Sequence, residues 1–278
     1  MITMIGHLAK DVNIYADGRM DVVPGGGVFY GGIAVRKLGE ECTVITKCSR
    51  KDLHLFKLFD EVGVNVKYVF TDKTTSIENR YPSSNPDERH SRMVEKADPF
   101  DESDIPIDGK FEYLHITPLW YGEFPENLIE LLRKRSFFLS IDAQGFVRRV
   151  REDGEMVRED WENKEKYMRY VDLLKVDSKE AEVLTGTKEI ERSAIMLHEF
   201  GSDLVILTHS NGVILYDGKK IYRSNFGSWR IEGRTGRGDT CVSSFIVGLK
   251  RGYSLQKALD FSADITTKKM NYPGPYVG

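Results

Sequence analysis

A glycine-rich loop that ends in an aspartate, Gly233-Arg-Thr-Gly-Arg-Gly-Asp239, runs directly into an apolar helical pattern. Glycines allow positive φ and let a backbone approach a ligand closely. The free N–H groups at the start of a helix attract anions, most often phosphate. A neighbouring carboxylate can take a proton from a hydroxyl, so the segment suits phosphoryl transfer to a hydroxyl. The alternative is a turn whose Asp239 caps the helix.

A second glycine-rich stretch, Pro24-Gly-Gly-Gly-Val-Phe-Tyr-Gly-Gly32, lies near the N-terminus. This ordered pair of motifs resembles the two signatures of the ribokinase-like (PfkB) carbohydrate kinase family, and the resemblance covers essentially the whole chain. It implies transfer of the γ-phosphoryl group of ATP to a hydroxyl of a sugar, nucleoside or related polyol. ATP and Mg²⁺ are the cofactors that it implies, and a small molecule is the partner.

The composition is that of a globular protein, since 40 % of the 278 residues are apolar and 30 % are charged. The net charge of −3 does not provide the basic surface that nucleic acids require, so no nucleic-acid partner is expected. No apolar run approaches membrane-spanning length, and the N-terminus does not read as a signal peptide. The three cysteines have no metal-like spacing, which predicts a cytoplasmic protein.

Strand and helix patterns alternate along most of the chain, which predicts an α/β fold with a mostly parallel sheet and helices on both faces. The family resemblance implies a three-layer αβα sandwich, with residues 1–278 as a single kinase domain. The ligand is expected beyond the carboxyl ends of the strands. The predicted strands are Ile2–Gly6, Cys42–Thr46, Val66–Phe70, Tyr113–Ile116, Phe137–Ile141, Val171–Val176 and Leu204–Thr208. The predicted helices are Val28–Leu38, Leu53–Val62, Pro125–Lys134, Lys179–Leu184, Ile190–Glu199, Asp239–Arg251 and Ser254–Met270.

Two segments, Val12–Val23 and Thr75–Val94, read instead as short polar strands joined by turns. The resemblance implies that segments near residues 12–23 and 66–95 form a small β lid over the acceptor. Exposed hairpins are the alternative. The acidic segment Ala97–Pro106 is predicted to be a surface connector.

The resemblance implies that Asp239 is the general base and that Gly236, Arg237 and Gly238 offer backbone N–H groups to the transferring phosphoryl group. Fixed donors of this kind stabilise the charge of the transition state. Within this loop the sequence departs from the family pattern at two positions, with Gly233 in place of an aspartate and Arg237 in place of an alanine. Arg237 either adds a cation beside the phosphates or points into solvent.

Two further segments match the family pattern for the cofactors. Asp177 and Glu180 correspond to the pair whose acidic member organises the waters around Mg²⁺, and a helix cap is the alternative or accompanying role. Thr208, Ser210 and Gly212 lie where the family has the turn that contacts the nucleotide, but Ser210 replaces a glycine and the turn is one residue shorter; a plain hairpin is the alternative.

For the acceptor, the resemblance implies Asp11, because a carboxylate can accept two hydroxyl hydrogen bonds; the alternative is a residue that merely ends a strand. Gly26 and Gly27 would let the backbone approach the acceptor. Tyr30 replaces an asparagine that many sugar kinases of the family carry, so it either shapes acceptor choice or is a core aromatic.

Residues 142–148, Asp-Ala-Gln-Gly-Phe-Val-Arg, resemble the version of this segment in kinases that act on inositol and its relatives. A cyclic polyol or sugar acid is therefore the favoured acceptor. Arg148 either reaches the acceptor or the phosphates, or pairs with a surface acid.

Other functions were weighed against these residues. A dinucleotide oxidoreductase needs Gly-x-Gly-x-x-Gly after the first strand, and a P-loop kinase needs Gly-x4-Gly-Lys-Ser/Thr; the chain has neither. A nucleoside kinase of the same family and a non-catalytic nucleotide or sugar sensor remain as alternatives. A monomer and a homodimer are both compatible with the sequence.

Overall fold

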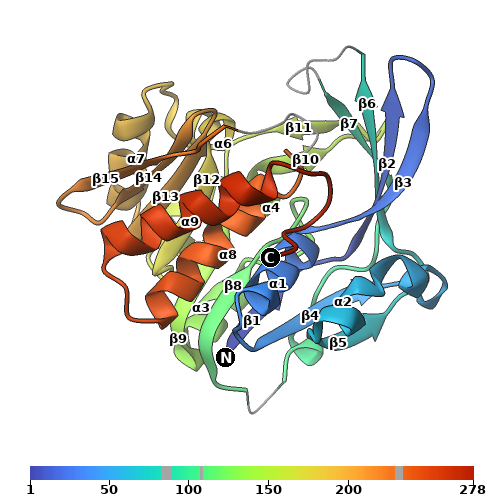
Figure 1. The fold of residues 1–278 in the computed structure, drawn as a ribbon, viewed down its shortest axis with the longest axis horizontal. Coiled ribbons are helices and arrows are strands. Elements are labelled where there is room, and N and C mark those ends of the chain that lie inside the picture. Colours follow the sequence, from blue (N-terminus) through green and yellow to red (C-terminus); the bar gives the residue numbers. More distant parts are fainter. Residues whose placement is uncertain (83–88, 107–108, 229–233) are drawn as a thin grey trace.

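A large sheet divides the molecule into two helical layers (Figure 1). The computed structural model describes residues 1–82, 89–106, 109–228 and 234–278. Within them, nine strands form the large sheet in the order β15-β14-β13-β12-β9-β8-β1-β4-β5. The pairs from β13 to β5 are parallel, and β14 and β15 add an antiparallel edge. The predicted α/β architecture with a mostly parallel sheet is confirmed.

The bounds of the elements follow. The large sheet contains β1 (Ile2–Ile5), β4 (Cys42–Cys48), β5 (Asn65–Phe70), β8 (Phe111–Ile116), β9 (Ser136–Asp142), β12 (Leu173–Asp177), β13 (Leu204–His209), β14 (Gly212–Tyr216) and β15 (Ile221–Asn225). The helices are α1 (Gly27–Lys37), α2 (Leu58–Val62), α3 (Asn127–Arg135), α4 (Gln144–Val147), α5 (Lys164–Met168), α6 (Ser178–Thr185), α7 (Ile190–Glu199), α8 (Arg237–Lys250) and α9 (Leu255–Lys269). Two short 3₁₀ segments cover Arg50–Phe56 and Glu102–Asp104.

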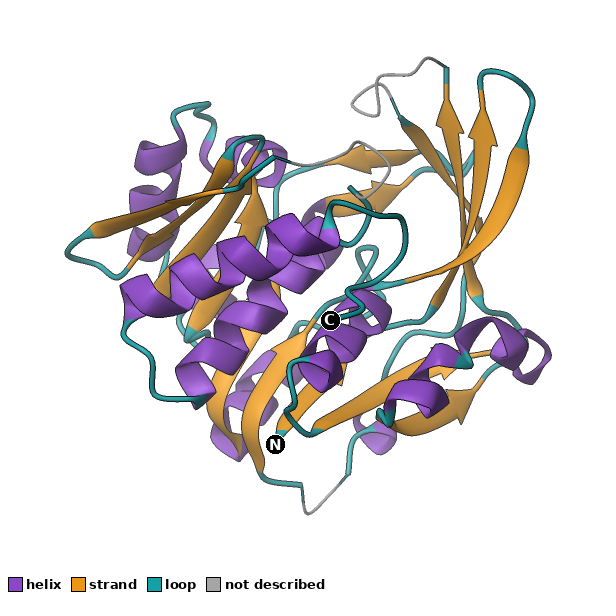
Figure 2. Cartoon of the chain, viewed as in Figure 1, coloured by secondary structure: helices purple, strands orange, loops and turns teal. Residues whose placement is uncertain are grey.

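Successive residues of the sheet strands enter two different cores, because side chains alternate across a sheet. In β12, Leu173 joins the core beneath α1, α8 and α9, whereas Leu174 and Val176 join the core beneath α3, α6 and α7. Both faces are therefore covered, which is why these strands are almost continuously apolar. Figure 2 shows the helices on the two sides of the strands.

A second, four-stranded sheet stands at one side of the body (Figure 1). Its strands are β2 (Ala9–Tyr15), β3 (Met20–Gly25), β6 (Thr75–Tyr81) and β7 (His90–Glu95), in the order β3-β2-β6-β7. Only the β2–β6 pair is parallel among them. The expected start of this sheet near residue 66 is too early, because β5 pairs with β4 in the large sheet.

Three local expectations differ from the structure. The predicted helix Leu53–Val62 is a 3₁₀ segment followed by the short α2. The hairpin strands β14 and β15 were not predicted, and the small ribbon of β10 (Arg148–Val150) and β11 (Met156–Arg158) was also missed. The connector at 97–106 is not a pure surface segment, because Ala97, Phe100 and Asp104 are buried. Asp104 lies 2.8 Å from Lys47 as an ion pair, which compensates its burial.

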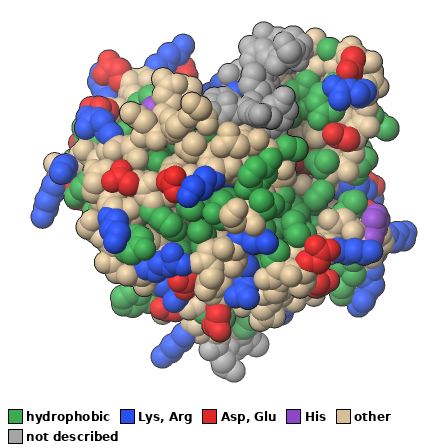
Figure 3. All heavy atoms as spheres, viewed as in Figure 1, with side chains coloured by type: hydrophobic (Ala, Val, Ile, Leu, Met, Phe, Trp, Pro, Cys, Tyr) green, Lys and Arg blue, Asp and Glu red, His purple; other side chains and the backbone are tan. Residues whose placement is uncertain are grey.

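The mixed charges on the surface and the modest apolar character of the helices agree with the composition. Lys and Arg side chains lie interspersed with Asp and Glu on the face shown in Figure 3. Among the described residues, no helix has both the length and the apolar character needed to cross a bilayer.

Trp161 provides a test of the core on the α3 side. Its ring is fully buried, stacks on Phe146 with centroids 4.4 Å apart, and donates its Nε1–H to Glu126. Replacing Trp161 by Ala should lower the free energy of unfolding by about 3–5 kcal/mol, through the cavity and the lost hydrogen bond. Urea denaturation followed by far-UV circular dichroism measures this loss. Phe137→Ala is the control, because Phe137 is 78 % exposed, and an equal loss in both variants would contradict the prediction.

Candidate active site

The starts of α1 and α8 meet at the side chain of Asp239. This residue lies in the first turn of α8, where the helix N–H groups favour a negative charge. A Cβ added to Gly27, the first residue of α1, would lie 2.8 Å from Asp239 Oδ1. The two glycine-rich motifs of the sequence are therefore in contact, as phosphoryl transfer at their junction requires.

Glycine is needed at this junction for steric reasons. The same added Cβ at Gly27 would lie 2.0 Å from Thr117 Oγ1, and one at Gly25 would lie 2.6 Å from Asp11 Oδ2. Gly26 has a φ of 101°, which side-chain-bearing residues rarely adopt. The glycine run thus lets two carboxylates, those of Asp11 and Asp239, approach one stretch of backbone.

Tyr30 supports the loop before α8. It is 4 % exposed, and a Cβ at Gly236 would lie 2.1 Å from its ring. Burial raises the pKa of its hydroxyl, and the charges of Asp11 and Asp239 raise it further. Tyr30 is therefore a buried aromatic that also forms part of the wall around the two carboxylates. Both roles considered for it from the sequence are compatible with this position.

Lys175 brings a buried positive charge to the loop before α8, on the side away from Tyr30. Its Nζ lies 3.0 Å from Asp142 and 3.6 Å from Glu180, and it would be 3.1 Å from a Cβ on Gly238. Burial alone would lower the pKa of Lys175, but Asp142 and Glu180 raise it, so the side chain stays charged. The carboxyl ends of β9 and β12 position these groups.

The carboxyl groups differ in their proton affinity. Burial raises the pKa of Asp239, whereas the charge of Lys175 lowers it. Burial also raises the pKa of Asp11 to about 6, against the opposing charges of Arg89 and Arg148. A carboxylate whose pKa lies above its usual range is a better proton acceptor near neutral pH. Asp239 therefore has the environment of a general base.

The Asp177–Glu180 pair forms a capping box at the start of α6. Asp177 Oδ1 accepts from the N–H of Glu180 at 2.8 Å, and Glu180 Oε2 accepts from the N–H of Asp177 at 2.7 Å. Burial raises the pKa of Glu180 to about 7. The pKa of Asp177 is lowered, because Lys175 and the cap hydrogen bonds outweigh its burial. The structural role is present, and the Mg²⁺ role remains a proposal.

The side chain of Arg148 is held by a hydrogen bond to a residue of the adjacent helix α4 and not by a surface acid. Its Nη2–H donates to Gln144 Oε1 at 2.8 Å, across one turn of the chain at α4. Burial lowers the pKa of Arg148 to about 10, and the charges of Arg89 and Arg158 add to this effect. Several basic side chains therefore gather on the side of Asp11 that faces β10 and β11.

The turn assigned to the donor is the tip of the β13–β14 hairpin. Thr208 is buried, Ser210 is exposed at the turn, and Gly212 begins β14. Arg237 is half-buried, with its guanidinium 5.8 Å from the centre of the Phe226 ring, and its charge also acts on His209. Arg237 therefore does not simply point into solvent. Gly233 lies outside the described residues.

Three side chains of this site received no role from the sequence, although Asp142 begins the segment 142–148 that resembles inositol kinases. Lys175 and Asp142 stand in apolar strands, and a charged residue in a buried strand is the signal that identifies them. Lys269 in α9 is also buried, and its Nζ–H donates to the carbonyl of Thr235 in the loop before α8. A period-3.6 pattern assigns a lysine near a helix end to the polar face, so no local pattern indicates a role for Lys269.

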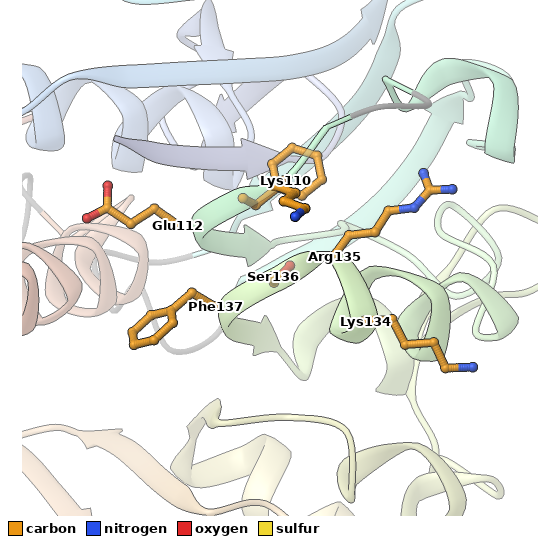
Figure 4. Close-up of a pocket in the computed structure, with 7 residues that line it drawn as sticks. Lys110, Glu112, Lys134, Arg135, Ser136 and Phe137 are labelled. Atoms are coloured by element: carbon orange, nitrogen blue, oxygen red, sulfur yellow. The ribbon is translucent and has the colours of Figure 1, made fainter.

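A surface hollow lies elsewhere, at the amino ends of β8 and β9. Its lining includes Lys110, Glu112, Lys134 and Phe137, whose side chains point away from one another (Figure 4). A binding site needs convergent polar groups, and the parallel strands place ligands at their carboxyl ends. The described residues contain no cluster of three or more His, Cys, Asp or Glu side chains arranged to hold a metal. The glycine junction is therefore the candidate site.

Comparison with known proteins gives a match over the whole chain. Residues 1–275 match the profile of the pfkB family carbohydrate kinases. A cytidine kinase of Thermococcus kodakarensis is 25 % identical in an alignment that covers 93 % of this chain and 91 % of that protein.

Two solved structures are more similar in sequence. One is a pyrophosphate-dependent kinase in the ribokinase family, complexed with a pyrophosphate analog and myo-inositol; it is 48 % identical, with a TM-score of 0.94, and the match covers 100 % of this chain and 97 % of that one. The other is a pyrophosphate-dependent myo-inositol-1 kinase converted into a myo-inositol-3 kinase by replacing an asparagine and a serine with leucine. It is 46 % identical, with a TM-score of 0.92, and the match covers 100 % of this chain and 95 % of that one.

The buried charge of Lys175 gives a test of the site's electrostatics. Lys175→Met leaves Asp142 and Glu180 without their counter-charge, so the free energy of unfolding should fall by about 3–5 kcal/mol at alkaline pH. Loss of the cation raises the folded-state pKa of Glu180 further above the value of about 7 that it has in the original chain. The deficit is therefore complete above that raised pKa and shrinks as the pH falls through it toward 7. Urea titrations at several pH values measure it.

Lys188→Met is the matched control, because Lys188 is 85 % exposed and its ion pair with Glu182 is open to water. Such a pair contributes little, so this variant should unfold like the original chain. A deficit in Lys175→Met that grows as the pH falls would show that the assigned charges are wrong.

Proposed function

Because the chain belongs to the pfkB family of carbohydrate kinases, we propose that it transfers a phosphoryl group from inorganic pyrophosphate to a ring hydroxyl of a cyclic polyol of the inositol type. The observation that carries this proposal is the similarity, over the full length, to pyrophosphate-dependent kinases of the ribokinase family, one of them bound to myo-inositol. The contact between the two glycine motifs at Asp239 supplies the chemistry.

The reaction uses the junction of α1 and α8. The acceptor lies between Asp11 and Asp239, with the glycine backbone beside it. Asp239 takes the proton of the acceptor hydroxyl while the hydroxyl oxygen forms its bond to phosphorus. The bond from phosphorus to the bridging oxygen breaks, and inorganic phosphate leaves. The N–H groups of Gly236, Arg237 and Gly238 hold the oxygens of the phosphoryl group during transfer.

Pyrophosphate replaces the ATP that the family resemblance implied. A donor without a base or ribose can be held only through its phosphate oxygens, so cations and N–H donors must provide all of its binding. Lys175 lies next to Gly238, and Arg148 acts on Asp239, which places two cations near the phosphoryl path. Arg237 stands over Phe226 and near the hairpin tip, where it can meet the second phosphate of the donor. In this proposal, Thr208, Ser210 and Gly212 border the donor rather than an adenine ring.

A Mg²⁺ ion would fit this site if the carboxylates contacted it through its bound water molecules. Its preferred ligands are oxygens, and carboxylates of Asp142, Asp177 and Glu180 gather here, but the ammonium of Lys175 already lies among them. The capping box also occupies one oxygen of Asp177 and one of Glu180. Asp177 and Glu180 would therefore hold waters of a hydrated ion. A bound Mg²⁺ would neutralise charge on the donor and its leaving phosphate.

The small sheet acts as a lid and reads the acceptor. Asp11 and Asn13 lie on one face of β2, and Asn79 and Ser91 lie on the same face of β6 and β7. Asn79 Nδ2 donates to Asn13 Oδ1 at 3.3 Å, and Ser91 Oγ donates to Asn79 Oδ1 at 2.8 Å. This polar row continues from the acceptor carboxylate, so it can select among the hydroxyls of a ring. Closure of the lid would exclude water and prevent hydrolysis of the donor.

The first test is a matrix of donors and acceptors. Pyrophosphate and ATP, each with Mg²⁺, are supplied with inositols, hexoses, pentoses, sugar acids and nucleosides including cytidine, and phosphorylated product is measured by mass spectrometry. We expect product with pyrophosphate and an inositol. Asp239→Asn should lower kcat by about 10²- to 10⁴-fold without loss of acceptor binding. The rate should fall on the acid side at a higher pH than an ordinary aspartate gives, because burial raises the pKa of Asp239.

Asp264→Asn is the matched control, since Asp264 is an exposed acid of α9 that pairs with Lys268. Product only with ATP would contradict the proposed donor, and product only with cytidine would favour the nucleoside kinase. Calorimetric binding of an inositol with no turnover in any combination would favour a sensor.

A second test addresses the lid. Asn79→Leu with Ser91→Leu removes the polar row but keeps the pairing of β6 and β7, so the chain should fold and keep turnover within about tenfold. The product should carry its phosphate on a different ring hydroxyl, which NMR of the isolated product identifies. Glu78→Leu with Arg92→Leu, at the neighbouring paired position on the opposite face, is the control. An unchanged product from the first double variant would remove Asn79 and Ser91 from acceptor selection.

A further inference from the structure

Lys269 has no part in the reaction described above, yet it is buried at the last position of α9. The ammonium of Lys269 donates to a main-chain oxygen, the carbonyl of Thr235. Removing an ammonium from water costs several kcal/mol, and this hydrogen bond ties the buried charge to the loop before α8.

The contact between Lys269 and Thr235 lies next to the residue that begins α8. Thr235 directly precedes Gly236, which has a φ of 79° and is the N-cap of α8. The ring of Tyr30 fills the space where Gly236 would carry a Cβ. The ammonium of Lys269 lies 5.5 Å from the centre of the same ring, within the range of a cation–π interaction. Lys269 and Tyr30 therefore hold two successive loop residues, from α9 and from α1.

Lys269 also brings charge to the site. Burial lowers the pKa of its ammonium to about 8, and the carboxylate of Asp239 opposes this shift. The group is therefore mainly charged at neutral pH. Among the described residues, the titratable groups that face it include the hydroxyl of Tyr30, on α1, and the carboxyl of Asp239, on α8. The loop itself carries Arg234 and Arg237.

We propose that Lys269 is a positioning residue for phosphoryl transfer: its ammonium is a built-in cation that fixes the Thr235 carbonyl and thereby the N–H groups of Gly236, Arg237 and Gly238. This inference rests on the proposed function, in which those N–H groups receive the phosphoryl group. Preorganised donors matter most in the transition state, so the loss should appear in kcat rather than in acceptor binding.

The test compares Lys269→Met with Lys268→Met under saturating pyrophosphate and inositol. Lys268 is the neighbouring lysine, 58 % exposed and paired with Asp264. Lys269→Met should lower kcat by about 10²-fold and leave the KM of the acceptor within about twofold, while Lys268→Met behaves like the original chain. A kcat within about threefold of the original in a folded Lys269→Met overturns the proposal.

A second set of measurements separates the effect of the charge of Lys269 from the effect of its packing. In the original chain, kcat should decline above about pH 8 as Lys269 loses its proton, and this alkaline decline should be absent from Lys269→Met. Lys269→Ala leaves space for a small cation, so added methylammonium should restore part of its kcat. A neutral compound of similar size, such as ethane-1,2-diol, should not restore it. Equal rescue by both compounds, or an alkaline decline that persists in Lys269→Met, contradicts the role of the charge.

A binding measurement separates this inference from the proposed function. Pyrophosphate should raise the Tm of the original chain and of Lys268→Met, and should raise that of Lys269→Met much less. If no donor and acceptor pair gives product, the proposed function fails, while this difference in Tm still supports the role of Lys269 in holding an anion. Equal Tm shifts in all three proteins contradict that role. If circular dichroism shows that Lys269→Met does not fold, Lys269→Gln replaces it, with the same outcomes.

Discussion

The missing Cβ atoms of Gly25, Gly27 and Gly236 are the constraint on which this structure depends. Asp11, Asp239 and Tyr30 occupy the space that side chains at those three positions would need. The starts of two helices and two carboxylates can share one small volume only because the backbone there is bare. The large sheet serves this junction, because parallel strands bring the loops that follow β1, β8, β9 and β12 to the same edge.

Buried charge is the second constraint, and it is local to the same edge. Lys175, Asp142 and Glu180 compensate one another, and the capping box of α6 holds Glu180 in place. Burying such a cluster costs desolvation free energy, and the cluster adds little to the stability of the fold compared with an apolar core. Its benefit is a set of charges whose positions do not need to reorganise when a highly charged ligand arrives. Activity at this site and stability of the fold therefore make opposing demands.

The sequence predicted the parallel sheet and its two helical layers, because these follow from periodicity. The family resemblance implied Asp11 for the acceptor and Asp239 for the base and left the role of Arg148 open, and the charges of these three residues act on one another in the structure. Lys175 and Lys269 escaped prediction because their roles depend on neighbours 33 and 34 residues away in the chain, which no local pattern reveals. The edge strands β14 and β15 were missed because the glycine and polar residues around them read as loop.

The two groups of residues on which the proposed function depends lie on separate parts of the backbone. The row from Asp11 to Ser91 belongs to the small sheet, whereas Lys175, Asp239 and Lys269 belong to the body. Substitutions in the small sheet disturb few buried contacts of the body, so they are cheap for the fold. Under the proposed function, natural variation in the small sheet can change the acceptor while the residues for phosphoryl transfer stay unchanged. A protein built in this way can evolve toward new substrates without changing its reaction.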